Sequence, residues 1–181
     1  MFMGEQDFNQ IFKQITPEEI PGDVFTLVGK DFFVVTAGTS ESCNSMVASG
    51  GGMGMHFRKP STMCIFAARR YTLGLIKRHQ AYTLSYFPDE YRAEFMLLGL
   101  KSGHDSDKMK ETKLTLIETP TGNVAFEEAR LIIECKLTQI TAVPAEDFYS
   151  EESKAYLAGA YTDPGEIREY VFGEITAVWM K

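Results

Sequence analysis

The stretch CNSMVASGGGMGM, residues 43–55, decides how the rest of the sequence is interpreted. Four of its residues are Gly, three are Met and none carries a charge. One interpretation is a β-strand that ends in a flexible glycine loop. The other is a strand whose backbone is cleared of large side chains, so that a flat or anionic ligand can lie against it. The surrounding sequence has to distinguish the two.

The composition is that of one globular domain over residues 1–181, with 44% hydrophobic and 24% charged residues. No apolar run approaches membrane-spanning length, and no basic and apolar signal segment stands at the N-terminus. We therefore expect a cytoplasmic protein without a membrane partner. The three cysteines, Cys43, Cys64 and Cys135, form no CxxC pair, so we expect buried thiols and neither a zinc site nor a disulfide framework.

Charge is distributed unevenly along the chain. The net charge of −7 argues against a nucleic-acid-binding protein. Between Glu41 and Asp89, however, there is no Asp or Glu, and six basic residues give this span a charge of +6, which leaves −13 for the rest. These residues are Arg58, Lys59, Arg69, Arg70, Lys77 and Arg78. Such a block suits an anionic ligand or a solvated basic face, and charge alone favours neither.

The hydrophobic pattern predicts many strands and few, short helices. Strands are expected as a pair over residues 24–37 with a turn at Gly29–Asp31, and over 45–49, 61–68, 81–87, 129–143 and 166–181. Helices are expected over 8–15, over 71–80 capped by Thr72, over 89–103 ending near Gly99 or Gly103, over 106–111 capped by Asp105 or Ser106, and over 150–161. This order lacks regular strand–helix alternation, which argues against a doubly wound parallel sheet. It favours a mainly antiparallel sheet that closes into a small barrel with helices outside.

Common phosphate and catalytic motifs are absent. A dinucleotide fingerprint that starts at Gly50 would need Gly at position 55, where the chain has Met. No phosphate loop, GxSxG or HExxH occurs, and the three histidines are not spaced as metal ligands. The sequence therefore calls for neither hydrolysis nor metal chemistry.

Two short segments remain as candidates for anion binding. RRYT, residues 69–72, places two guanidinium groups where a strand passes into a helix. SGHDSDK, residues 102–108, places a hydroxyl and a glycine before another helical turn that contains Lys108. Together with the glycine-rich strand, they could form an anion pocket beside a flat surface, which suits a flat ring system with a phosphate tail.

The order of these motifs resembles that of flavin reductase-like proteins with an FMN-binding split β-barrel, in particular the flavoredoxin-like branch. The resemblance rests on VVTAGT, NSMVASGGGMG, KP, RRYT, YTLSYF, LGLKSGHDSDK and EEARLIIEC, and it extends from about Val34 to Gln139. It implies a mainly β fold, namely an antiparallel, six-stranded Greek-key split barrel with short helices outside. The glycine-rich strand would then lie along a flavin ring.

The same resemblance implies an FMN site and assigns residues to it. Those expected along the flavin ring are Asn44, Ser45, Met46, Ala48, Ser49 and Gly50. Those expected at the phosphate end are Arg69, Arg70, Tyr71, Thr72, Ser102, Gly103, Asp105 and Lys108. The family is typically a homodimer with FMN close to the subunit interface.

The implied activity is hydride transfer from NADH or NADPH to flavin, followed by electron delivery to free flavin or a redox protein, with no catalytic side chain required. Asn44 and Ser45 are the expected donors to the ring's pyrimidine edge. Two alternatives stay open: an FMN-binding electron carrier without a nicotinamide site, and a split-barrel binding module that has lost FMN. Gly50, where relatives often have Trp, and His104, where they often have Arg, keep the second alternative open.

Overall fold

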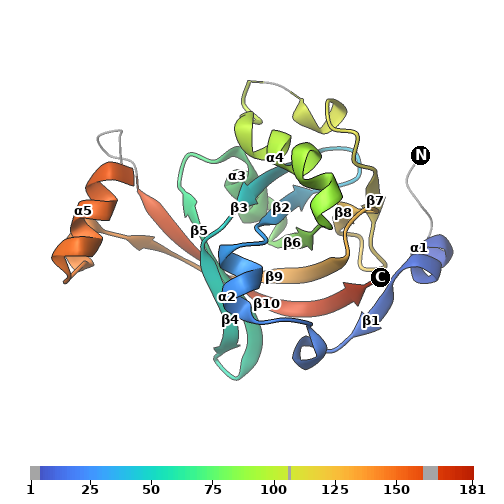
Figure 1. The fold of residues 1–181 in the computed structure, drawn as a ribbon, viewed down its shortest axis with the longest axis horizontal. Helices are drawn as coiled ribbons and strands as arrows, with labels where there is room; N and C mark the ends of the chain where they lie inside the picture. The colour runs from blue at the N-terminus through green and yellow to red at the C-terminus, as the bar shows by residue number, and fades with distance from the viewer. Residues whose placement is uncertain (1–4, 106, 161–166) are drawn as a thin grey trace.

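One antiparallel sheet of eight strands forms the frame of the molecule (Figure 1). Its strands are β1 (Lys13–Ile15), β2 (Phe33–Gly38), β3 (Cys43–Ala48), β4 (Gly51–His56), β5 (Lys59–Ala67), β6 (Ala81–Tyr86), β9 (Leu131–Val143) and β10 (Arg168–Met180). They are ordered β3-β2-β6-β9-β10-β5-β4, and β1 pairs with β10 beside this path. A separate hairpin consists of β7 (Leu116–Glu118) and β8 (Val124–Phe126). The structure is a computed structural model, and it describes residues 5–105, 107–160 and 167–181.

Short helices surround the sheet. They are α1 (Glu5–Ile11), α2 (Val24–Gly29), α3 (Tyr71–His79), α4 (Arg92–Leu100) and α5 (Glu151–Ala160). Four 3-10 turns connect them to the strands: η1 (Pro17–Glu19), η2 (Asp89–Tyr91), η3 (Lys108–Lys110) and η4 (Ala145–Asp147). No helix among the described residues has both the length and the apolar character needed to cross a bilayer.

The sheet curls until its two halves meet without closing. β3 is the last strand of one half, and β5 belongs to the other, where it pairs with β4 and β10. β3 and β5 contact each other, although no ladder joins them. We call this line of contact the seam. Because β3 and β5 do not pair at the seam, β2 is the only strand partner of β3 among the described residues.

Two hydrophobic cores lie on opposite faces of the sheet. β2 separates them, because Val35 packs into the inner core and its neighbour Val34 into the outer one. The inner core contains Leu73 and Ile76 of α3, while the outer core contains Phe95 of α4. Both helices next to the seam are therefore held by buried side chains, which fixes the loops that follow them.

The long strands β9 and β10 run side by side and continue beyond the barrel to α5. Figure 1 shows α5 at the far end of these strands, away from the other helices. We call described residues 141–160 and 167–170 the arm. Tyr149 and Tyr156 of the arm are 93% and 76% exposed. The arm therefore presents aromatic rings that the rest of the described chain does not cover.

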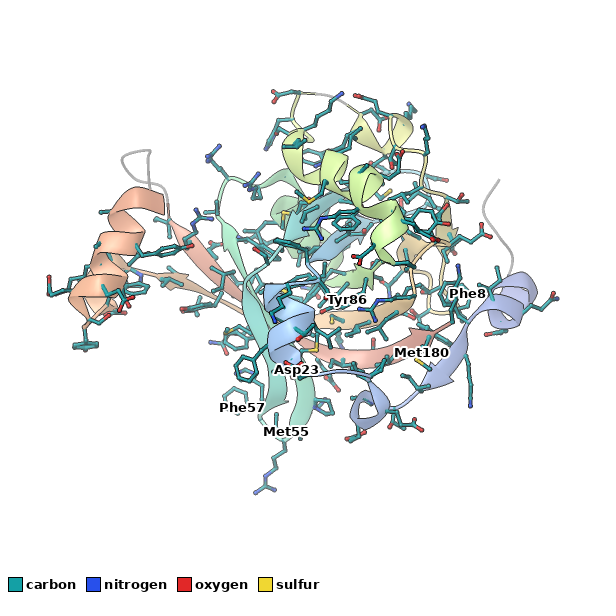
Figure 2. The ribbon with its side chains drawn as sticks, viewed as in Figure 1. Phe8, Asp23, Met55, Phe57, Tyr86 and Met180 are labelled. Atoms are coloured by element: carbon teal, nitrogen blue, oxygen red, sulfur yellow. The ribbon has the colours of Figure 1, made fainter. Side chains whose placement is uncertain are left out.

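Gly51 and Gly52 of the glycine triplet belong to a strand, so the interpretation of the triplet as a flexible loop is wrong. Gly51–His56 forms β4, paired antiparallel with β5. Gly51 has φ +139°, and a Cβ there would lie 1.9 Å from the Met63 carbonyl oxygen, so only glycine fits. Phe57 and Arg58, both with positive φ, turn the chain into β5. Figure 2 shows Met55 and Phe57 at the tip of this hairpin, pointing away from the body.

Segment 24–29 is helical, so the first strand predicted there is wrong. The Asp23 carboxylate accepts a hydrogen bond of 2.9 Å from the Thr26 backbone N–H and thereby caps α2. Val24, Leu27 and Val28 follow helical spacing and pack on the inner core. The cap and this spacing outweigh the strand propensity of the valines.

Other boundaries also differ from the prediction. The first expected helix divides into α1 and the short strand β1. Arg70 is the N-cap of α3, although Thr72 was expected there. Asp107 is the N-cap of η3, although Asp105 or Ser106 was expected to cap this turn. Ser106, Tyr161 and Glu166, to which predictions also referred, lie outside the described residues. The antiparallel, mainly β architecture is as expected, but the sheet has eight strands where six were expected.

Candidate functional site

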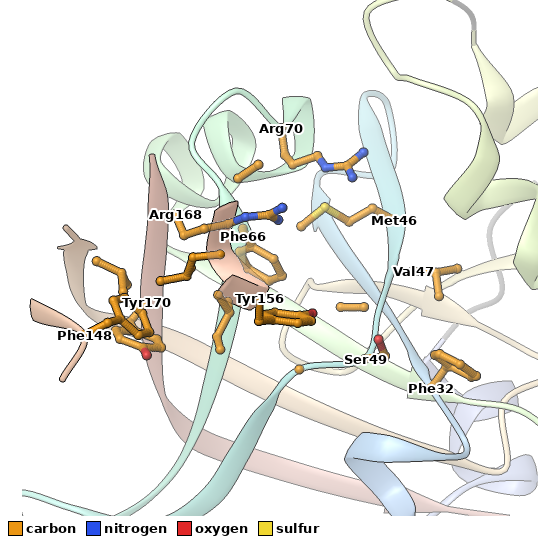
Figure 3. A pocket seen from close by; sticks show the side chains of 16 residues that line it. Phe32, Met46, Val47, Ser49, Phe66, Arg70, Phe148, Tyr156, Arg168 and Tyr170 are labelled. Atoms are coloured by element: carbon orange, nitrogen blue, oxygen red, sulfur yellow. The ribbon is translucent and has the colours of Figure 1, made fainter. Parts of the chain in front are cut away.

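A cavity of about 380 Å³ lies at the seam, and we call it the seam cavity (Figure 3). One wall, the barrel wall, consists of Phe32, Met46, Val47, Ala48, Ser49, Gly50, Ile65, Phe66, Ala67 and Arg70. The opposite wall comes from the arm and consists of Val143, Phe148, Tyr156, Leu157, Arg168 and Tyr170. The cavity exists because the two halves of the sheet touch here without pairing.

The segment 46–50 contributes half of the barrel wall, and part of it has little side-chain bulk. Ala48, Ser49 and Gly50 contribute small side chains or none. A Cβ added at Gly50 would meet only the Ile65 Cδ1 atom, at 4.0 Å. This wall therefore lets a planar group approach the backbone, as the second interpretation of the segment requires.

A second cavity of about 220 Å³ continues from the first, and we call it the anion pocket. Met46, Val47 and Arg70 line both cavities. The other residues of the anion pocket are Asn44, Arg69, Tyr71, Thr72, Leu98, Gly99, Lys101, Ser102, Gly103, His104 and Lys108. Its described lining contains four Lys or Arg side chains and no Asp or Glu. The pocket therefore offers a positive environment next to a flat apolar surface.

Contacts between β3, α3 and the loop after α4 shape the anion pocket. The side-chain Nδ2 of Asn44 donates to the Thr72 hydroxyl at 2.7 Å and to the Ser45 carbonyl oxygen at 3.3 Å. Gly103 packs directly on Asn44, because a Cβ at Gly103 would lie 2.6 Å from Asn44 Oδ1. Any larger residue at position 103 would push the loop away from β3.

Lys108 is 2% exposed and reaches beneath the floor of the anion pocket. Its Nζ donates to the carbonyl oxygens of Leu98 at 2.6 Å and Lys101 at 2.8 Å. Burial, and secondarily the positive charge of Arg70, lower the pKa of Lys108 to about 8. The ammonium group thus caps the end of α4 and holds a positive charge that an anion in the pocket would stabilise.

His104 lines the anion pocket, whereas Asp105 does not. The His104 ring packs edge-on against Tyr71, with centroids 5.0 Å apart, and its Nε2 lies 3.3 Å from the Arg69 carbonyl oxygen. Asp105 lines a neighbouring cavity that also contains the carboxylates of Glu41 and Asp107. Asp105 is therefore not among the residues that line the anion pocket.

The structure brings together most of the residues predicted for the site. All except Ser45 and Asp105 line the seam cavity or the anion pocket. Ser45 is fully buried, and its hydroxyl lies 2.7 Å from that of Thr36, so its side chain is committed to the interior. Both hydrogens of the Asn44 amide have partners within the protein. Donors from this strand to a ligand would therefore be backbone N–H groups.

The arm residues of the seam cavity were missed. Arg168 pairs with Ala67 and Tyr170 with Ile65 in the ladder between β10 and β5, so residues about 100 positions apart line the same cavity. Phe148, Tyr156 and Leu157 come from η4 and α5. The one available signal was the alternation of Arg168 and Tyr170 along a predicted strand, which places both on one face.

Metal ligands and thiols were also considered among the described residues. No group of three or more His, Cys, Asp or Glu side chains in the described part of the chain could hold a metal ion. Burial raises the pKa of the Cys43 thiol to about 11, so this group is neutral at pH 7. Cys64 and Cys135 are buried free thiols, which confirms the interpretation of these two as small core residues.

The sequence matches the protein family described as "Flavin reductase like domain" over residues 28–181. No curated protein matches the sequence. The fold is similar to that of an FMN-binding protein from Thermus thermophilus with bound p-hydroxybenzaldehyde, at 20% identity and a TM-score of 0.64, over 90% of this chain and 77% of that chain.

Two further solved structures are similar to this chain. A putative flavin reductase with a split barrel domain from Shewanella frigidimarina has 16% identity and a TM-score of 0.65, over 84% of this chain and 67% of that chain. The flavoredoxin of Desulfovibrio vulgaris has 19% identity and a TM-score of 0.63, over 92% of this chain and 77% of that chain. The split-barrel fold expected from the sequence is thereby confirmed.

Proposed function

Because the chain belongs to the flavin reductase-like family, we propose that it binds FMN and works as an oxidoreductase that takes hydride from NADH or NADPH. Electrons would pass on to free flavin or to a redox protein. The observation that carries the proposal is the continuity of the two cavities. Met46, Val47 and Arg70 line both, so a flat apolar surface leads directly into a positive pocket.

The residues present fit FMN at both of its ends. The wall at 46–50 accepts a planar ring system, because Ala48, Ser49 and Gly50, at and just after the end of the edge strand β3, have small side chains or none. Arg70, Thr72, Ser102 and Lys108 surround the pocket proposed for the phosphate. Guanidinium and ammonium groups form charge-assisted hydrogen bonds to phosphate oxygens, which are stronger than neutral ones.

FMN, when bound, would supply the hydride acceptor. The chain would hold and orient it. Since β3 pairs with β2 on one side only, every second backbone N–H of β3 points away from its strand partner. These N–H groups would stabilise negative charge that develops on a ring beside them. The proposal requires no side-chain acid, base or nucleophile.

We further propose that two copies of the chain associate, as the resemblance implies. The exposed rings of Tyr149 and Tyr156 on the arm support this, because large exposed aromatic side chains are enriched at protein interfaces. Light scattering together with size-exclusion chromatography would give the mass, and a monomer at all accessible concentrations would contradict this part of the proposal.

The first test is a visible absorbance spectrum of the purified chain, recorded before and after addition of FMN and desalting. We expect retained flavin bands that bleach when NADH or NADPH is added without oxygen. Retained bands that neither nucleotide bleaches would point to the electron carrier instead. A protein that remains colourless after FMN addition would exclude the oxidoreductase and leave the binding module.

A further inference from the structure

The neighbouring cavity that Asp105 lines has a volume of about 520 Å³, and we call it the acidic pocket. It shares a wall of four residues with the anion pocket, namely Asn44, Tyr71, Gly103 and His104. The seam cavity shares three different residues with the anion pocket and none with the acidic pocket. The anion pocket therefore lies between the seam cavity and the acidic pocket.

The shared wall is tightly packed. A Cβ added at Gly103 would lie 2.6 Å from Asn44 Oδ1 and 2.9 Å from Tyr71 Cδ1. The His104 ring packs edge-on against Tyr71 on the same wall. A ligand that continues beyond the anion pocket, away from the seam cavity, would therefore have to cross this wall and enter the acidic pocket.

The two pockets differ in the sign of their charge. The described lining of the acidic pocket contains three carboxylates, those of Glu41, Asp105 and Asp107, and one ammonium group, that of Lys110. With His104 neutral, these groups give a net charge of −2. The described lining of the anion pocket contains Lys and Arg side chains and no Asp or Glu. The electrostatic potential therefore changes sign across the shared wall.

The pKa values of two groups reflect these opposite potentials. In the acidic pocket, burial and secondarily the charge of Asp107 raise the pKa of the Cys43 thiol to about 11. In the anion pocket, burial and secondarily the charge of Arg70 lower the pKa of Lys108 to about 8. Cys43 directly precedes Asn44 on β3, so the negative potential of Asp107 extends to the strand that carries the shared wall.

We propose that the acidic pocket makes the site selective for the flavin mononucleotide FMN over the flavin dinucleotide FAD. This inference rests on the proposed function, which places the FMN phosphate in the anion pocket and its ring in the seam cavity. The second phosphate of FAD would continue on the opposite side, across the shared wall. There it would lie beside the carboxylates of Glu41, Asp105 and Asp107, and like charges repel each other.

A second electrostatic effect acts in the same direction but does not involve the carboxylates. The phosphate of FMN is a monoester, whose second ionisation has a pKa of about 6, so most of it is doubly charged at pH 7. The phosphates of FAD are each linked on two sides and lack this second ionisation. The anion pocket therefore attracts FMN more strongly in any case, and carboxylate variants are needed to separate the two effects.

The test measures the dissociation constants of FMN and FAD for the full chain by calorimetry at pH 7. We expect FAD to bind at least about tenfold more weakly than FMN. The double variant Glu41→Gln with Asp105→Asn should lower the ratio of the two constants about three- to tenfold, mainly by strengthening the binding of FAD. Raising the salt concentration from about 0.01 M to about 1 M should lower the wild-type ratio more than that of the double variant, because salt screens exposed charges.

The matched control is Glu90→Gln. It removes the same charge from an exposed residue of η2 that lines neither pocket, so the ratio should stay unchanged. Glu41 and Asp105 are exposed, so their amide variants should fold, and their melting temperatures check this. Asp107→Asn is an independent third variant. It also releases Lys110 from an ion pair of 2.9 Å and should lower the ratio as well.

The outcomes distinguish this inference from the proposed function. Equal affinity for FMN and FAD, or a ratio that the carboxylate variants leave unchanged, would overturn selection by the acidic pocket and leave the oxidoreductase intact. A preference for FMN that these variants reduce, in a chain whose flavin neither NADH nor NADPH bleaches, would support the inference and contradict the oxidoreductase. Binding of neither flavin would overturn both.

Discussion

The side-chain amide of Asn44 donates a hydrogen bond of 2.7 Å to the hydroxyl of Thr72, and both side chains are buried. This bond joins the edge strand β3 to the first turn of α3 across 28 positions of the sequence. It holds the flat wall of the seam cavity in place relative to the basic residues 69–70. The site therefore depends on a contact that need not touch any ligand.

Thr72→Val should weaken both the fold and FMN binding. The variant keeps the side-chain shape but leaves a buried Asn44 N–H without a partner, which costs about 1–3 kcal/mol. Urea unfolding should show this loss, and a flavin fluorescence titration should show a raised FMN dissociation constant. Thr72→Ser keeps the hydroxyl and is the control. If Thr72→Val were as stable as Thr72→Ser, the bond would have no role in stability.

Arg70→Ala should raise the FMN dissociation constant about 10- to 100-fold, since a hydrogen bond to a charged group contributes about 1.5–3 kcal/mol. Arg78→Ala removes the same charge from the last turn of α3, away from the pocket, and should have little effect. The same fluorescence titration measures both variants. An unchanged dissociation constant in Arg70→Ala would remove this residue from the phosphate site.

Alkaline pH should weaken FMN binding through Lys108. Its pKa of about 8 means that the ammonium loses its proton between pH 7 and pH 9.5, and with it the attraction to phosphate. The dissociation constant for FMN should therefore rise over this range. In Lys108→Met the constant should be higher at pH 7 and change less with pH. A parallel pH dependence in both proteins would assign the effect to another group.

The stability of the FMN-free protein should change with pH in the opposite direction. The pKa of Lys108 is lowered from 10.5 in the unfolded chain to about 8 in the native one, so the unfolded chain binds more protons between these values. The contribution of Lys108 to the free energy of unfolding therefore rises as pH increases from about 8 toward 10.5. The difference between wild type and Lys108→Met in urea unfolding at pH 7.5 and 9.5 isolates this contribution.

Two adjacent glycines should respond very differently to alanine. Gly51→Ala forces a Cβ to within 1.9 Å of the Met63 carbonyl oxygen at φ +139°, and backbone strain of this kind costs about 1–3 kcal/mol before any clash is counted. Gly50→Ala meets only Ile65 Cδ1 at 4.0 Å and should change the melting temperature little. Comparable melting temperatures for both variants would contradict the close approach of β4 to β5.

Much of the fold could be predicted, because each predicted strand and helix carries its own local signal. The apolar residues 131–133 and the alternation of apolar and polar residues in 82–86 are examples. The errors occurred where the local signal was ambiguous. Residues 24–29 read as a strand from their valines, although Asp23 and the spacing of Leu27 indicate a helix. β4 was missed because its glycines disfavour strands, and only pairing with β5 makes it one.

The candidate site could be predicted only in part. Residues 44–50 and 69–72 belong to motifs that can be recognised by their order, and the structure places them around two connected cavities. The commitment of the Ser45 hydroxyl to Thr36 depends on the pairing of β2 with β3. The arm wall depends on the register of β10 against β5, which brings Arg168 opposite Ala67. No local pattern encodes that register.

The central position of β10 determines when the site can form during folding. β10 is made after every other strand, yet it lies between β9 and β5 and also pairs with β1. Until it is in place, the β4–β5 hairpin has no strand to join, and one half of the seam is missing. Contacts of such long sequence separation form slowly. We therefore expect β2, β3, β6 and β9 to assemble first, and the seam to be completed only in the last folding step.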